Sequence, residues 1–407
     1  MSEPFTKLTV SQQLVMKLRT QIESGVWRAG GNMPSLRSLA DRYGVSLNTV
    51  QKAVRELSAL DLIDQQPGQS GVIKSVRRSR PAAHQQIAWI EGYDPETVSS
   101  YWSEEIMRNA RAMLTRADLR VTVLTYQYRQ PDIAGQVMRL LEPIAGQIAG
   151  VFCPSIIPLL PVIEHIEQMG LPWMTVSPIH SSINHNFVSS DDLGGGSMAG
   201  RCFANLGVRR LAVLHFGIHE LSQRNKTTGL CRGYLEQGQA PPVIDLVCCH
   251  DQEARSGHEA MAAYLKNHEP PQGIFATGDW LAVGAIRAVQ EAGLRVPQDI
   301  SVMGSTGIPS NRLLFSPTLA AIAQPVRQLG EQIATGLIHM VREGVSKVAG
   351  QSIPCQFIPG QSLNVPESIQ KQWVADSLNP VPSQNDQTVE DSTANSDVST
   401  LITEPAM

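Results

Sequence analysis

The chain of 407 residues is long enough for two or three domains. It is 42% hydrophobic and 17% charged, with no run near the roughly 18 apolar residues of a membrane span, so no membrane-spanning helix is expected. The first ten residues lack the basic and then apolar pattern of a signal peptide, and six cysteines are too few for a disulfide framework, so we expect a cytoplasmic protein.

The net charge of −4 is unevenly distributed along the chain. Residues 1–80 hold 12 Lys/Arg and 6 Asp/Glu, a net of +6, whereas residues 81–407 hold 21 and 31, a net of −10. A basic N-terminal module on an acidic body is typical of a DNA-binding arm attached to another domain.

The chain begins with three predicted helices. The first covers residues 11–24 and ends at Gly25. Residues 32–60 form two more amphipathic helices at a period of 3.6 residues, with Gly44 at the joint and Ser46 as the N-cap of the second. Two helices joined by a short Gly-containing turn indicate a helix-turn-helix, whose second helix would lie in a DNA major groove.

The segment after these helices predicts a winged helix. In residues 62–76 two short β-like runs flank PGQSG, which indicates a β-hairpin whose tip, with Gly68, would reach the minor groove or the backbone. Residues 77–86 (RRSRPAAHQQ) have the composition of an exposed linker. Its three arginines are interpreted either as a solvated charge run or as phosphate contacts.

Residues 87–366 alternate between short apolar runs and amphipathic helices, which predicts an α/β fold of parallel sheets with crossover helices. At roughly 280 residues it is too large for one sheet of ordinary width, so we expect two lobes facing each other across a cleft. The predicted strands are 87–92, 121–126, 150–155, 173–177, 211–216, 243–249, 273–277 and 300–305, with strand-like 356–360 and 361–365 near the end. The predicted helices include 102–115, 158–169, 192–206, 254–267, 279–292 and 325–343. Residues 367–407 are polar and acidic, and we expect a disordered tail.

The first 75 residues resemble the GntR family of winged-helix repressors. The resemblance is carried by Gly25-Val26-Trp27, the string MPSLRSLADRYGVSLNTV and the wing that ends in Val76. It implies that Arg37, in the PSxR string, contacts DNA. Two arginines that are frequent in the family are replaced by Leu47 and Gln51, which implies a different operator.

The geometry of the second helix of the motif offers replacements. Asn48, Gln51, Lys52 and Arg55 form an i, i+3, i+4, i+7 stripe, which is either a solvated helix face or a groove-reading one. Asn and Gln can pair bidentately with adenine, while Arg55 lies where a phosphate contact is expected. The residues predicted to contact DNA are Arg37, Ser46, Asn48, Thr49, Gln51, Lys52, Arg55 and Gly68.

Residues 86–366 resemble the effector-binding core of the LacI/GalR family, which is similar to periplasmic sugar-binding proteins. The segments that carry this resemblance are GIFATGDWLAVGAIRAVQEAGLRVPQDISVMGS (273–305), DDLGGGSMAG (191–200), NLGVRRLAVL (205–214) and SPTLAAIAQPVRQLG (316–330). The resemblance implies two periplasmic-binding-protein-like lobes and a small polar effector, a sugar or a sugar derivative. Aromatic faces with convergent polar groups suit such a ligand.

Effector contacts are implied by the same resemblance, position by position. Lys226 stands where the family has a ligand-gripping arginine, so the charge is kept but the bidentate fork is lost. An acidic or phosphorylated effector therefore stays open beside a neutral sugar. Asp279 could equally cap its helix and Trp102 could equally be lobe core. The predicted effector-binding residues are Asp94, Tyr101, Trp102, Lys226, Asp279, Trp280, Thr306 and Gln324.

Other motifs do not form an enzyme constellation. Gly194-Gly195-Gly196 lacks the Lys-Ser/Thr of a P-loop, and Cys248-Cys249-His250 lacks the spacing of a metal site. Asp191-Asp192 could be an acid pair, but Asp192 is a natural helix N-cap. We expect no enzyme activity, no cofactor and no metal.

The sequence thus predicts four segments: a winged helix-turn-helix (1–76), a linker (77–86), a two-lobed effector-binding and dimerisation domain (87–366), and a disordered acidic tail (367–407). The predicted function is that of a homodimeric transcriptional regulator, a repressor of a palindromic operator whose affinity is switched by the effector. The sign of the response stays open. The alternative is a ligand-binding protein whose head does not read an operator.

Overall fold

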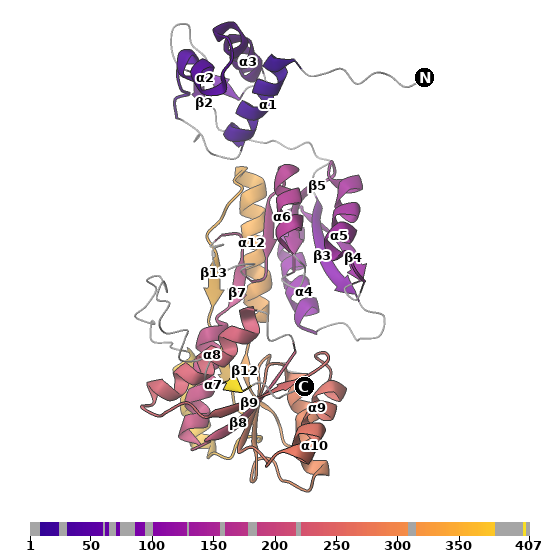
Figure 1. The fold of residues 1–407 in the computed structure, drawn as a ribbon, viewed down its shortest axis with the longest axis vertical. Coiled ribbons are helices and arrows are strands. Elements are labelled where there is room, and N and C mark those ends of the chain that lie inside the picture. Colours follow the sequence, from indigo (N-terminus) through magenta and orange to yellow (C-terminus); the bar gives the residue numbers. More distant parts are fainter. Residues whose placement is uncertain are drawn as a thin grey trace.

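The computed structural model describes residues 9–23, 31–59, 62–64, 71–73, 86–93, 101–127, 130–154, 159–177, 185–216, 221–307, 315–378 and 402–403. Along the long axis of Figure 1 a small helical head comes first, then an N-terminal lobe, then a C-terminal lobe. The α/β fold class expected from the sequence is confirmed, with a helix-turn-helix at the N-terminus. Within the described ranges, no helix combines the length and apolar character needed to cross a membrane.

The head is a three-helix unit with a small hairpin. Its elements are α1 (Val10–Glu23), α2 (Leu36–Tyr43), α3 (Leu47–Ala59) and the antiparallel pair β1 (Ile63–Asp64) and β2 (Val72–Ile73). The apolar stripes expected from the helical period are buried together in one core that includes Leu18, Leu39 and Leu57. The base of the predicted wing is confirmed, whereas its tip lies outside the described residues.

The N-terminal lobe is built on a parallel sheet in the order β4-β3-β5-β6. Its strands are β3 (Gln86–Tyr93), β4 (Arg120–Gln127), β5 (Ile148–Cys153) and β6 (Trp173–Thr175). One face is covered by α4 (Tyr101–Arg116) and α12 (Val326–Glu343), and the other by α5 (Ile133–Leu141) and α6 (Leu159–Gln168), with a 3₁₀ turn (Glu142–Ile144) after α5. Because helices cover both faces of this sheet, its strands carry apolar side chains on both sides.

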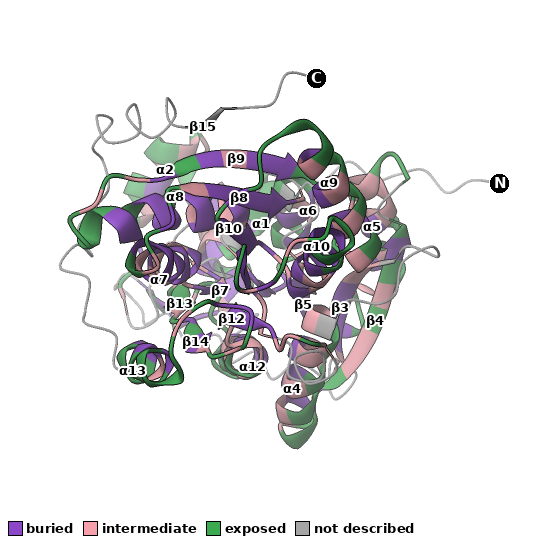
Figure 2. Ribbon diagram, turned by 90° about the horizontal axis from the view of Figure 1, so that it is seen from below, coloured by how far each residue is buried: buried purple, intermediate pink, exposed green. Residues whose placement is uncertain are grey.

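The C-terminal lobe is built on a seven-stranded sheet in the order β14-β12-β11-β10-β8-β9-β15, parallel except for β14. Its strands are β8 (Arg210–His215), β9 (Val243–Cys248), β10 (Gly273–Ala276), β11 (Ser301–Gly304), β12 (Ala320–Ala323), β14 (Gln356–Ile358) and β15 (Ile402–Thr403). Helices α7 (Asp192–Asn205) and α8 (Leu221–Glu236) cover one face, and α9 (Ala254–Asn267) and α10 (Asp279–Glu291) cover the other (Figure 2).

Three chain crossings join the two lobes. The first runs from β6 through β7 (Val188–Ser190) to α7, the second from β12 to α12, and the third from β13 (Gln351–Ile353) to β14. β7 and β13 pair in parallel and connect two of the crossings. Polar groups at the ends of the C-terminal strands therefore lie beside the crossings, where a ligand between the lobes would sit.

Two predictions about the end of the chain are wrong. Residues 361–365 form turns rather than a strand, although the Ser362 carbonyl still accepts the N–H of Val302. Residues 367–378 form a helix, α13 (Glu367–Leu378), where we expected the disordered tail to begin. Its Trp373 packs edge-on against Phe357 of β14, with 5.4 Å between the ring centroids, and one buried aromatic ring thus docks an otherwise polar segment.

Candidate functional site

A polar stripe runs along the outer side of α3. Its inner face is buried, with Val50, Ala53, Val54 and Leu57 at 0–2% exposure. Asn48, Lys52 and Arg55 are exposed on the other side, and Gln51 is partly buried. Because the buried stripe fixes the rotation of α3, these four side chains present two amides and two cations on one surface.

The joint that positions α3 is fixed by hydrogen bonds. Ser35 caps α2 by accepting the N–H of Ser38 at 3.2 Å, and Gly44 ends α2 in the left-handed region with φ 62°. The Ser46 hydroxyl accepts the N–H of Thr49 at 3.2 Å, and the two hydroxyl oxygens lie 2.8 Å apart. Of the remaining predicted DNA contacts, Arg37 is exposed in α2. Gly68 lies outside the described residues.

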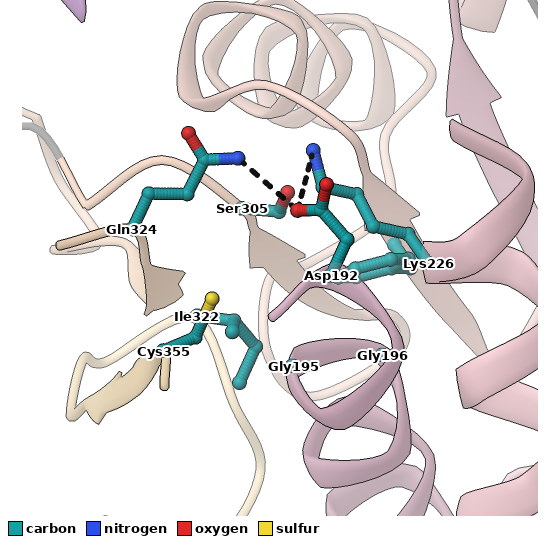
Figure 3. A pocket seen from close by; sticks show the side chains of 9 residues that line it. Asp192, Gly195, Gly196, Lys226, Ser305, Ile322, Gln324 and Cys355 are labelled. Atoms are coloured by element: carbon teal, nitrogen blue, oxygen red, sulfur yellow. Dashed lines mark hydrogen bonds and ion pairs between the residues drawn. The ribbon is translucent and has the colours of Figure 1, made fainter. Parts of the chain in front are cut away.

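A buried ion pair lies in the C-terminal lobe beside the crossings (Figure 3). Lys226 Nζ of α8 is 3.7 Å from Asp192 Oδ1 of α7, and each side chain is 7% exposed. The same Oδ1 accepts the Gln324 amide at 3.4 Å, from the second crossing, and the Ser190 hydroxyl at 3.2 Å. Three segments that are far apart in the sequence thus meet at one carboxylate.

The neighbouring carboxylate has a different role, which corrects the interpretation of Asp192 as an N-cap. Asp191 is the N-cap of α7 and accepts the N–H of Gly194 at 2.8 Å. Asp192 is the first residue of the helix and is buried. With the cap supplied by Asp191, the second carboxylate is directed to Lys226.

The ion pair borders a small cavity with an unsatisfied hydroxyl. The cavity is also lined by Ser305, Gln324 and Cys355. Ser305 at the end of β11 is 2% exposed, and its Oγ has no hydrogen-bond partner in the described part of the chain. Burial raises the pKa of the Cys355 thiol, so this side chain is a neutral wall of the cavity.

A larger hollow of about 560 Å³ shares Asp192 with this cavity and reaches the crossing strands. Its lining is rich in serine hydroxyls, with two carboxylates and one amide, and these groups come from the first crossing, from the start of α7, from β13 and from the N-terminal part of α8. The polar residues of the lining are Ser177, Ser189, Ser190, Asp191, Asp192, Ser222, Asn225 and Ser352. Such a lining can hydrogen-bond a small polar molecule from several directions.

Glycines set the distance between the helices that carry the ion pair. A Cβ at Gly196 of α7 would overlap the backbone of Lys226, and one at Gly200 would overlap Leu230. Likewise, a Cβ at Gly229 or Gly233 of α8 would overlap the backbone of α7. The two helix backbones are thus in direct contact, which brings Asp192 and Lys226 together without water between the helices.

The other predicted effector residues fall into different surroundings. Asp279 is 1% exposed, and its Oδ1 accepts the N–H of Thr306 at 3.0 Å, so this carboxylate holds the end of β11. Trp280 packs edge-on against Phe315, with 6.0 Å between the ring centroids. Trp102 packs against the core of the N-terminal lobe. Asp94 and the side chain of Tyr101 lie outside what the structure describes.

The N-terminal lobe contributes an acidic group near the end of β3. Burial raises the pKa of Glu91, and the nearby charge of Glu104 adds to the increase, while a hydrogen bond from Ser103 opposes it. Among the described residues of the predicted set, the structure brings Lys226 and Gln324 together at Asp192, and it joins Asp279 to Thr306 by a hydrogen bond. Asp192, Ser190 and Ser305 were not predicted, and the signal for Asp192 was a second acid directly after an N-cap residue.

Two family models match separate parts of the chain. Residues 10–73 match the bacterial regulatory proteins of the gntR family, and residues 201–363 match a periplasmic binding protein-like domain. The chain joins a gntR-family domain to a periplasmic-binding-protein-like domain. The exposed stripe of α3 belongs to the first domain, and Lys226, Ser305 and Gln324 belong to the second.

Curated relatives match part of the chain. The HTH-type transcriptional repressor PurR of Pectobacterium atrosepticum is 32% identical over 195 residues, which cover 47% of this chain and 55% of the relative. PurR of Yersinia pestis bv. Antiqua is 38% identical over 150 residues, which cover 36% and 42%. The chain thus spans about half the length of the curated relatives that it matches.

Solved structures of transcriptional regulators share the fold. A lac repressor dimer bound to operator and the anti-inducer ONPF has a TM-score of 0.59 at 18% identity and covers 69% of this chain and 95% of its own. The complex of the transcriptional regulator CelR with cellobiose has a TM-score of 0.61 at 17% identity, covering 81% and 100%. A LacI-family regulator from Enterococcus faecium with bound ribose has a TM-score of 0.58 at 20% identity, covering 68% and 98%.

Proposed function

We propose that the protein is a transcriptional repressor that binds a palindromic operator as a homodimer and responds to a small polar effector. The observation that carries this proposal is the exposed amide-and-cation stripe on α3 of a gntR-family domain. Asn48 and Gln51 read adenines in the major groove, and Lys52, Arg55 and Arg37 contact phosphates. The Ser46–Thr49 end of α3 and the wing tip at Gly68 lie against the backbone of the DNA.

The proposed effector lies between the two lobes, against Gln324, Thr306 and the cavity at Ser305. Asp94, Tyr101 at the start of α4 and Trp280 at the start of α10 complete the contacts, and Trp102 and Asp279 support them from the lobe cores. What supports an uncharged effector, a sugar or a neutral derivative, is the pairing of Lys226 with Asp192. Because Asp192 already neutralises the charge of Lys226, an acidic or phosphorylated ligand gains little electrostatic attraction from this lysine.

In the proposed mechanism the effector closes the cleft and rotates the lobes, so that two heads no longer fit successive major grooves. The opposite response, in which the effector strengthens operator binding, involves the same cleft, lobes and heads. The proposal includes no catalytic step and places the protein with the DNA in the cytoplasm. A partner copy is required because each head reads one half-site.

The test is selection of bound sequences from random DNA, followed by titration of the selected site at several salt concentrations. Lys52→Ala and Lys17→Ala form a matched pair, since both remove one exposed cation from the head, the second from α1. We expect the loss of Lys52 to lower affinity and to reduce the salt slope by about 1, and the loss of Lys17 to change neither.

No enriched sequence in the selection would contradict the proposal and would leave a ligand-binding protein with a non-reading head. Effector binding is tested by a thermal-shift screen of sugars, sugar acids and sugar phosphates that starts with ribose and cellobiose, the sugars bound in two structural neighbours.

A further inference from the structure

The last strand of the chain lies at the outer edge of the C-terminal sheet. β15 (Ile402–Thr403) pairs in parallel with β9, with Ile402 beside Ile244 and Thr403 beside Asp245 (Figure 1, yellow). Apart from β15, the strand order makes β9 the edge of this sheet. An edge strand offers unpaired N–H and C=O groups to any extended segment that can reach it.

We propose that the outer edge of β9 is a docking site for an extended peptide and that the chain's own C-terminal segment occupies it as a tethered strand. The proposal is independent of the regulatory function. It assigns a role to the part of the predicted tail that follows α13, which neither DNA reading nor effector binding uses.

Chain length supports docking within one molecule. α13 packs against β14, at the opposite edge of the sheet from β15, and Figure 2 shows it on the side away from β9. The six strand spacings between β14 and β15 correspond to about 29 Å. Leu378 and Ile402 are 24 residues apart, and flexible chains of 24 residues in general have a root-mean-square span of about 24–29 Å. A tether gives the highest effective concentration when its span matches the distance to be bridged.

The register specifies which backbone groups make the contact. The N–H groups of Val243 and Cys249 donate to Arg209 and His215, towards β8. Because directions alternate along a strand, the N–H and C=O groups of Ile244 and Leu246 point to the outer edge. The pairing of Thr403 with Asp245 then directs the N–H of Thr403 to the Ile244 carbonyl and its C=O to the Leu246 N–H, whereas the N–H of Ile402 points away.

This alternation provides a matched pair of proline variants. Thr403→Pro removes the donor of the ladder, whereas Ile402→Pro removes an N–H that faces away from β9, a position where edge strands accept proline. The readout is amide hydrogen exchange, resolved to single residues, in the full chain. The amides of Val243, Asp245 and Val247 are internal controls, because they face β8.

We expect Thr403→Pro, and truncation after Leu378, to speed exchange at Leu246 and Ile244 by about tenfold, the value of one or two lost hydrogen bonds. Ile402→Pro should leave both amides protected, and protection should not depend on protein concentration. Equal exchange at Ile244 and Leu246 in the full and truncated chains would overturn the proposal. Protection that disappears on dilution would overturn docking in the same molecule and assign the strand to a second copy.

Discussion

The stripe on α3 and the cluster around Asp192 use similar side chains in opposite surroundings. On α3, Lys52 and Arg55 are exposed to water. In the C-terminal lobe, Lys226 and Asp192 are 7% exposed and compensate each other. An exposed charge can be removed with little effect on folding, so its loss is seen in binding alone. A buried pair contributes to folding and binding together, so the two effects have to be separated by the choice of variant.

The largest effect is expected from breaking the buried pair. Lys226→Ala leaves the Asp192 carboxylate buried without its cation, so we expect the free energy of unfolding to fall by about 3–5 kcal/mol in urea denaturation. The double variant Lys226→Met with Asp192→Asn removes both charges and should recover most of this loss.

The exposed pair of Arg287 and Glu291 on α10 is the control for this prediction, with side chains 76% and 51% exposed. Arg287→Ala should cost no more than about 0.5 kcal/mol. Equal losses for Lys226→Ala and Arg287→Ala would contradict the contrast between buried and exposed charges.

A smaller effect is expected at the contact between α7 and α8. Gly196→Ala would push its Cβ into the backbone of Lys226, so we expect a loss of about 1–3 kcal/mol in the free energy of unfolding. Gly146→Ala is the control, because its Cβ would meet open space. A Gly196→Ala variant as stable as Gly146→Ala would show that the helices separate easily and do not fix the ion pair.

On the α3 stripe, Gln51→Ala should change stability by no more than about 0.5 kcal/mol. It should reduce the discrimination between the selected operator and a site with one substituted adenine by about 1–3 kcal/mol. The measurement is a pair of titrations with the two DNA sequences. Unchanged discrimination would mean that Gln51 does not face a base.

The smallest effect concerns Glu91, whose pKa is raised mainly by burial. A carboxyl whose folded pKa lies above its unfolded value stabilises the fold when protonated, and this contribution is lost as pH rises through the raised pKa. We therefore expect Glu91→Gln to have a higher melting temperature than the wild type at neutral pH. The difference should vanish below the ordinary glutamate pKa of 4.5. A difference of the same size at both pH values would contradict this cause.

Much of the fold could be predicted from the sequence, because helical period and buried runs are local signals. The exposed stripe of α3 could be predicted because the apolar positions Val50, Ala53 and Val54 mark its buried face. Eight strands of the two lobes lie within a few residues of their predicted ranges. β12 (AAIA) and β7 (VSS) are too short or too poor in β-branched residues to give such a signal.

The cluster at Asp192 could be predicted only in part. Lys226 and Gln324 were found through a family resemblance, but their meeting at Asp192 depends on contacts between α7, α8 and the second crossing. A contact between residues so far apart in the sequence cannot be predicted from a local sequence pattern. The role of Asp192 was also hidden by Asp191, because either acid could cap α7 and only the backbone direction decides between them.

The proposed effector binds between the lobes and changes how tightly the head binds the operator. An operator titration measures this coupling directly. The selected operator is titrated with the protein in the presence and absence of each sugar that raises its melting temperature. We predict that such a sugar changes operator affinity by about 5–150-fold, the usual range of coupling between two sites. A sugar that binds and leaves the operator affinity unchanged would contradict this coupling.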